Sequence, residues 1–84
     1  METFDIIRRL AVETLGIAEE PLERAKTLRE AGIDSLAAID LIYAVEARLG
    51  ISVPVEDLAN VRSLRDLAVV ADRLVTRKVH SHED

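Results

Sequence analysis

Residues 32–50 read GIDSLAAIDLIYAVEARLG, and this stretch decides the fold of the chain. It predicts a helix from Ser35 or Leu36 to Leu49, which ends at Gly50 because glycine readily adopts the left-handed conformation that closes a helix. From Leu36 on, only three residues of this helix are charged, and the other eleven are Leu, Ile, Val, Ala or Tyr. The helix therefore carries more apolar surface than a single buried stripe requires.

The apolar residues of this helix divide into two groups. One group supplies the stripe that a helix in a bundle buries, and it comprises Ala38, Leu41, Ile42, Val45 and Leu49. The other group lies on a different face at spacings of three, four and seven, and it comprises Leu36, Ile39 and Tyr43. A small protein that exposes such a row usually presents it to a partner, whereas the alternative is a helix buried on both faces.

Helical periodicity also dominates the rest of the chain. A first helix is predicted from Phe4 to Leu15, with Thr3 in position to cap it and Gly16 as its stop. Its apolar stripe comprises Ile7, Leu10, Ala11 and Leu15. Beyond the central helix, Pro54 breaks the chain and one short helical turn is expected at residues 56–60.

A last helix is predicted to begin after Ser63. Ser63 and Asp66 have the spacing of a capping box, in which each residue satisfies backbone donors of the first helical turn. The apolar face of this helix comprises Leu64, Leu67, Ala68, Ala71, Leu74 and Val75. Residues 78–84 are polar, so we expect a disordered tail after a domain of residues 1–77.

The segment from Gly16 to Asp34 is long and mixed in character. Pro21 and the charged residues around it, including Glu19 and Glu20, suggest a solvated surface loop, and a loop this long in a small domain is often functional. Together these elements predict an all-α fold. We expect a small four-helix bundle, with three main helices, one short helix and a long loop before the second helix.

Composition narrows the classes of function. The chain has 84 residues and a net charge of −5, so nucleic acid and anionic membrane surfaces are unfavourable partners, whereas basic protein surfaces are suitable. It has no cysteine, which excludes a disulfide framework. The charged N-terminal residues predict neither a signal peptide nor a membrane span, so we expect a cytoplasmic protein and, by default, a monomer.

Ser35 stands where a helix can accept an attached phosphate. If Asp34 caps the helix, the Ser35 hydroxyl stays free in the first turn, where unpaired backbone N–H groups and the helix dipole favour an anion. The simpler interpretation is that both residues merely cap the helix. Positions 37 and 38 are alanine, so no Glu or Gln completes a capping box here.

At these residues the chain resembles the acyl carrier proteins. The segment from Gly32 to Leu36 looks like the Asp-Ser-Leu attachment motif of that family, and it opens an apolar helix. The likeness continues through the Gly-x-x-x-Pro stop at Gly50 and Pro54, the acidic pair Glu56-Asp57 and the last helix. It covers residues 4–75.

The resemblance implies a role and a set of site residues. In the family, a phosphopantetheinyl transferase attaches 4′-phosphopantetheine to the serine that matches Ser35, next to Asp34. The thiol of this arm carries cargo as a thioester to acyl-loading, condensing and modifying enzymes, and the carrier itself is not an enzyme. The matching recognition residues that would bind these partners are Leu36, Ile39, Asp40, Tyr43 and Glu46.

The chain also departs from the best-known fatty-acid carriers. Ala37 and Ala47 stand where those proteins often have acidic residues, and Arg48 adds a positive charge. The predicted recognition face is therefore less acidic, and we expect weaker steering by charge. This favours a specialised pathway of polyketide type over housekeeping fatty-acid synthesis.

Several alternatives stay open. An aminoacyl or peptidyl carrier would resemble this chain too, although Ile33 before Asp34 favours acyl cargo over the Gly-Gly motifs of many such carriers. An unmodified helical adaptor could use the apolar row for docking. A serine hydrolase is disfavoured because the only histidines, His80 and His82, lie at the end of the chain, where they also make a poor metal site.

Overall fold

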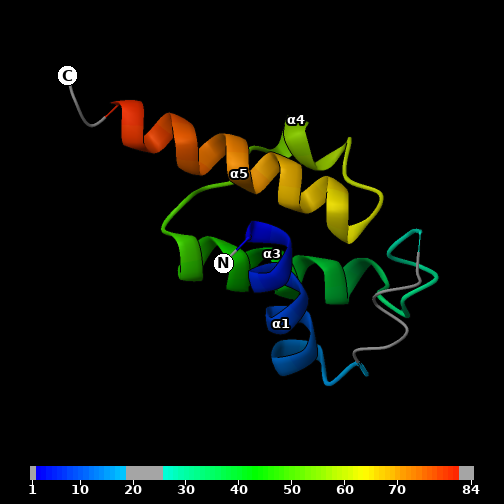
Figure 1. The fold of residues 1–84 in the computed structure, drawn as a ribbon. Helices are drawn as coiled ribbons and strands as arrows, with labels where there is room; N and C mark the ends of the chain where they lie inside the picture. The colour runs from blue at the N-terminus through cyan, green and yellow to red at the C-terminus, as the bar shows by residue number, and fades with distance from the viewer. Residues whose placement is uncertain (1, 19–25, 82–84) are drawn as a thin grey trace.

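A computed structural model describes residues 2–18 and 26–81, with the backbone alone for residues 79–81. The described residues form the helices α1 (Thr3–Leu15), α3 (Ser35–Leu49), α4 (Val55–Leu58) and α5 (Leu64–Ser81), shown in Figure 1. They contain no strand. The all-α fold with one short helix is thus confirmed, whereas the loop predicted around Pro21 lies outside the described residues.

The three longer helices enclose the core. α1 packs against both α3 and α5, and Figure 1 shows it crossing α3. The first residues of α3 and α5 lie at the same end of the molecule, beside the loop that precedes α3 (Figure 1). One aromatic contact supports the junction of α1 and α5, since the Arg65 guanidinium carbon lies 4.4 Å from the centroid of the Phe4 ring.

The core is aliphatic, in keeping with the Leu, Ile, Val and Ala residues that make up the predicted stripes. Its largest fully buried side chains are Ile7, Leu41, Val45 and Leu67, one or more from each long helix. Full burial of a side chain of this size contributes about 1.5–3 kcal/mol. The predicted stripes of α1 and α3 either are buried or pack against this core, as does the apolar face of α5 from Leu64 to Leu74.

The predicted helix stops at two glycines and the predicted serine cap at the start of α5 are confirmed. Gly16 and Gly50 close α1 and α3 in the left-handed conformation, with φ of 67° and 66°. At the start of α5, the Asp66 amide donates to Ser63 Oγ over 3.1 Å. The Asp66 carboxylate in turn accepts from the Arg62 amide over 3.0 Å, one residue before the N-cap, so the serine half of the capping box is formed and the acidic half is shifted by one residue.

The prediction that Thr3 caps α1 is wrong. The N-cap is Glu2, and its side chain makes no capping hydrogen bond. Thr3 is instead the first helical residue, and its hydroxyl donates to Asp72 on α5. Tertiary packing of α1 against α5 thus engages the hydroxyl that the local pattern assigned to a cap.

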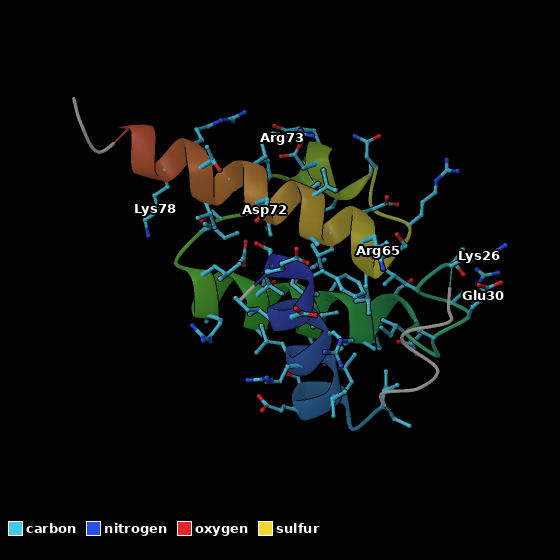
Figure 2. The ribbon with its side chains drawn as sticks, in the orientation of Figure 1. Lys26, Glu30, Arg65, Asp72, Arg73 and Lys78 are labelled. Atoms are coloured by element: carbon cyan, nitrogen blue, oxygen red, sulfur yellow. The ribbon has the colours of Figure 1, made fainter. Side chains whose placement is uncertain are left out.

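The last helix is longer than the sequence predicts. α5 continues to Ser81, four residues into the segment for which we expected a disordered tail. The basic residues Arg77 and Lys78 suit the C-terminal part of a helix, where the dipole favours cations. Lys78 Nζ also donates to the Gly50 carbonyl oxygen over 2.7 Å, and Figure 2 shows this side chain pointing from α5 toward α3. Residues 82–84 lie outside the described residues, so the boundary at residue 77 stays a prediction.

Candidate functional site

Ser35 is the first residue of α3, and its side chain is exposed. The residue before it performs the capping, because Asp34 Oδ1 accepts from the Ala37 amide over 2.8 Å. The Ser35 hydroxyl has no hydrogen-bond partner within the described residues. Asp34 therefore caps α3, and the Ser35 hydroxyl takes no part in the cap. Ser35 is thus available for modification.

The loop before Ser35 is held in place by buried side chains and by backbone hydrogen bonds. The buried side chains of Ala31 and Ile33 join the core, and the Ile33 amide donates to the Leu28 carbonyl over 2.9 Å. Gly32 between them has φ of 84°, a conformation that glycine adopts without steric cost. These contacts set the direction in which the chain enters α3, and with it the position of Ser35.

A shallow groove of about 730 Å³ adjoins Ser35. Its walls come from the loop before α3, the first turns of α3 and the segment between α4 and α5. The lining residues are Thr27, Leu28, Arg29, Gly32, Ile33, Asp34, Ser35, Ala38, Val61 and Arg62. The groove thus combines apolar side chains with both guanidinium groups and the Asp34 carboxylate.

These residues fit a phosphopantetheine arm. A serine hydroxyl that is exposed and uncommitted can form the phosphodiester, and the first turn of α3 offers unpaired backbone N–H groups to its charge. The groove beside it gives the start of the arm a mixed polar and apolar surface. Asp34 is the unfavourable neighbour, although its Oδ1 atom is occupied by the Ala37 amide.

The predicted partner-binding row is exposed on α3. The accessible fractions are 75% for Leu36, 45% for Ile39 and 64% for Tyr43. This excludes the alternative in which α3 is buried on both faces, since large apolar side chains on its second face meet solvent. Asp40 is exposed as well and lies beside Ile39 in the sequence.

Glu46 differs from the other four predicted partner-binding residues. Its side chain is half-buried, and Oε2 accepts from the Val53 amide over 2.7 Å. The carboxylate therefore holds the segment that follows α3 against the helix. This gives Glu46 a structural role that the sequence did not indicate, because a bond between positions 46 and 53 depends on how the chain turns after Gly50.

Arg29 and Arg62 are groove residues that the sequence analysis missed. They are 33 positions apart in the chain, and no motif links them. A backbone bond brings their segments together, since the Leu28 amide donates to the Arg62 carbonyl over 2.8 Å. Only the tertiary structure could identify them.

Two further findings concern metals and membranes. Among residues 2–18 and 26–81, no group of three or more His, Cys, Asp or Glu side chains is arranged to hold a metal ion. Within the same ranges, no helix combines the length and the apolar character that a bilayer crossing demands.

Comparison with known proteins agrees with this geometry. A family model described as a phosphopantetheine attachment site matches residues 5–69, which include Ser35. The acyl carrier protein of Campylobacter hominis is 29% identical over 93% of this chain and 100% of its own length. The acyl carrier proteins of Wolinella succinogenes and Campylobacter jejuni are 32% and 31% identical, over 80% and 88% of this chain and 90% and 97% of their own lengths. The chain therefore belongs to the acyl carrier protein family.

Proposed function

We propose that this chain carries acyl groups as thioesters on a phosphopantetheine arm attached to Ser35. The observation that carries the proposal is the exposed, uncommitted Ser35 hydroxyl at the start of α3, within the span of the matching attachment-site model. When bound, the arm supplies a thiol, which the chain otherwise lacks because it has no cysteine.

The part of Ser35 in loading the arm follows from its chemistry. Its Oγ attacks the phosphorus of coenzyme A that bears the pantetheine, and a new P–O bond forms. The bond between the attacked phosphorus and the oxygen that bridges it to the second phosphorus breaks, adenosine 3′,5′-bisphosphate leaves with that oxygen, and the hydroxyl proton passes to a base of the transferase. The chain itself has a passive role here, so we propose that it is a carrier and not an enzyme.

The partner surface follows from the exposed side of α3. We propose that Leu36, Ile39 and Tyr43 enter apolar depressions of the transferase and of the acyl-loading, condensing and modifying enzymes, with Asp40 meeting a basic residue. Glu46 is the weakest member of the proposed set, because its carboxylate already binds Val53.

The pathway and setting are proposed from the sequence. Alanines at positions 37 and 47 and Arg48 make the partner surface less acidic, which favours a specialised pathway of polyketide type. We further propose a cytoplasmic monomer whose carrier domain comprises residues 1–77.

Intact-mass measurement tests the attachment. The wild-type chain and Ser35→Ala are incubated with coenzyme A and a broad-specificity phosphopantetheinyl transferase. We expect the wild type alone to gain the mass of one phosphopantetheine. If folded wild-type protein gains none, the carrier proposal is wrong, and the exposed row of α3 then favours an unmodified docking adaptor. Loading of the modified protein by acyl or by aminoacyl adenylating enzymes distinguishes the two kinds of carrier.

A further inference from the structure

Two arginines that have no partner among the described residues line the groove beside Ser35. Arg29 comes from the loop before α3, and Arg62 from the segment between α4 and α5. Both side chains are exposed, and neither guanidinium has an ion pair or a hydrogen bond within the described residues. In a chain of net charge −5, the lining of this groove has two cations and one carboxylate, that of Asp34, so the groove is locally cationic.

The backbone around these arginines is held in place. The Leu28 amide binds the Arg62 carbonyl over 2.8 Å, so the two segments are joined directly beside the groove. The Gly32 amide donates to the Arg29 carbonyl over 3.0 Å, and the Arg62 amide is bound by Asp66. On binding a ligand, only the side chains of Arg29 and Arg62 would have to become ordered, because the backbone is already fixed. This lowers the entropic cost of binding.

The nearby carboxylates are engaged elsewhere. Asp34 accepts from the Ala37 amide, Asp66 from the Arg62 amide, and Glu30 from the Lys26 amide. Figure 2 shows Glu30 and Lys26 together on the loop. Each of these carboxylates is bound to backbone N–H and none forms an ion pair with Arg29 or Arg62. Among the described residues, no carboxylate thus occupies either guanidinium group, and both can meet an added anion.

We infer that Arg29 and Arg62 together hold the phosphodiester of the arm on Ser35. This inference rests on the proposed function. The phosphate is bonded directly to Ser35 Oγ and must lie at this groove, whereas the thioester and its cargo are at the far end of the arm. Guanidinium groups suit the role because they bind phosphate oxygens in a bidentate manner. They would also offset repulsion between the phosphodiester and Asp34.

Nuclear magnetic resonance on the unmodified and modified chain tests the inference. The ¹⁵N-labelled wild type, Arg29→Gln and Arg62→Gln are compared with Arg73→Gln, whose side chain lies on α5 away from the loop (Figure 2). Intact mass confirms complete modification, and backbone amide spectra confirm the fold. We expect the Nε–Hε signals of Arg29 and Arg62 to move on modification of the wild type, while that of Arg73 stays. The ³¹P signal should differ from wild type in both groove variants and match it in Arg73→Gln.

Added salt provides a second criterion, since ionic screening weakens contacts between exposed charges. The arginine shifts should shrink as sodium chloride is raised. The inference fails if the wild type is fully modified but the Nε–Hε signals stay in place, or if the ³¹P signal is the same in all four proteins. A wild type that gains no mass overturns the proposed function and this inference with it, so the two failures are distinguishable.

Discussion

Asp34 and Ser35 are neighbours with separate roles. The carboxylate satisfies a free amide of α3, and the hydroxyl next to it is left for covalent chemistry. Since Asp34 already provides the cap, modification of Ser35 costs the helix no hydrogen bond. The pair therefore allows the chain to be modified at a helix N-terminus without loss of stability from that terminus.

Removal of the Asp34 cap should destabilise the fold. We expect Asp34→Ala to lower the free energy of unfolding by about 1 kcal/mol, the usual cost of losing an N-cap side chain. Asp40→Ala is the matched control, because Asp40 is exposed on the same helix and makes no hydrogen bond within the described residues. Urea unfolding measures both. Equal losses in the two variants would show that the cap contributes nothing beyond a surface charge.

Residues differ in how well the sequence predicts them. Asp34 and Ser35 could be identified because capping and exposure at a helix start depend on the next few positions. Glu46, Arg29 and Arg62 could not be assigned, since their contacts or surroundings involve segments distant in the chain. The hydroxyl of Thr3 was misassigned for the same reason, because it meets Asp72.

At the scale of elements, Glu46 connects α3 to the segment that follows it. We expect Glu46→Ala to lower the free energy of unfolding by about 1.5–3 kcal/mol, as for other hydrogen bonds to a charged group. Glu46→Gln keeps an acceptor for the Val53 amide and should lose less. Glu13→Ala on α1 is the control, as its exposed side chain has no partner within the described residues. If urea unfolding finds Glu46→Ala as stable as this control, the carboxylate does not hold the segment.

The exposed row of α3 leads to a prediction about partners. Leu36→Asp should slow phosphopantetheinylation at least about tenfold, because burial of one leucine contributes about 1.5–3 kcal/mol and about 1.4 kcal/mol is a factor of ten. Helix content by circular dichroism should not change. Val69→Asp is the control, since Val69 is 58% exposed but lies on α5. Equal rates for both variants and the wild type would rule out the row as a contact surface.

Helix starts were easier to predict than the end of the last helix. Ser63 and Asp66 mark the start of α5 by a local capping pattern, in which the Asp66 amide donates to Ser63 Oγ and the Asp66 carboxylate accepts from the Arg62 amide. No Gly or Pro follows to end the helix, so the polarity of residues 78–84 was the one feature that predicted a tail. The helix extends further because Lys78 reaches α3, a contact that polarity does not reveal.

At the scale of the whole molecule, an aliphatic core without large aromatic side chains favours a shelter for cargo between the helices. We expect an octanoyl group on the arm to move the methyl signals of Leu41, Val45 and Val61, compared with the free thiol. Leu41 and Val45 are buried, and Val61 lines the groove beside Ser35. The exposed methyls of Val69 serve as the internal control. Unmoved signals at all three core positions would mean that the cargo stays in solvent.

The overall fold could be predicted because apolar spacing, caps and glycine stops all indicated the same helices. It could not be predicted that the first residues of α3 and α5 lie together beside the loop before α3, because this depends on how the helices pack (Figure 1). Ser35 could therefore be singled out as the expected attachment residue through the resemblance to the acyl carrier proteins, whereas the surface around it could not be predicted.

The bond from Lys78 to Gly50 also bears on how the protein is shortened or fused. The polarity of the sequence suggests a truncation after residue 77. Such a variant would lose Lys78, whose ammonium group donates to the carbonyl oxygen of Gly50 at the end of α3. A linker or affinity tag joined there would remove this bond between α5 and the end of α3. Fusion after residue 81 would retain the bond from Lys78 to Gly50. A fusion of this domain to another protein should therefore include α5 to its last residue.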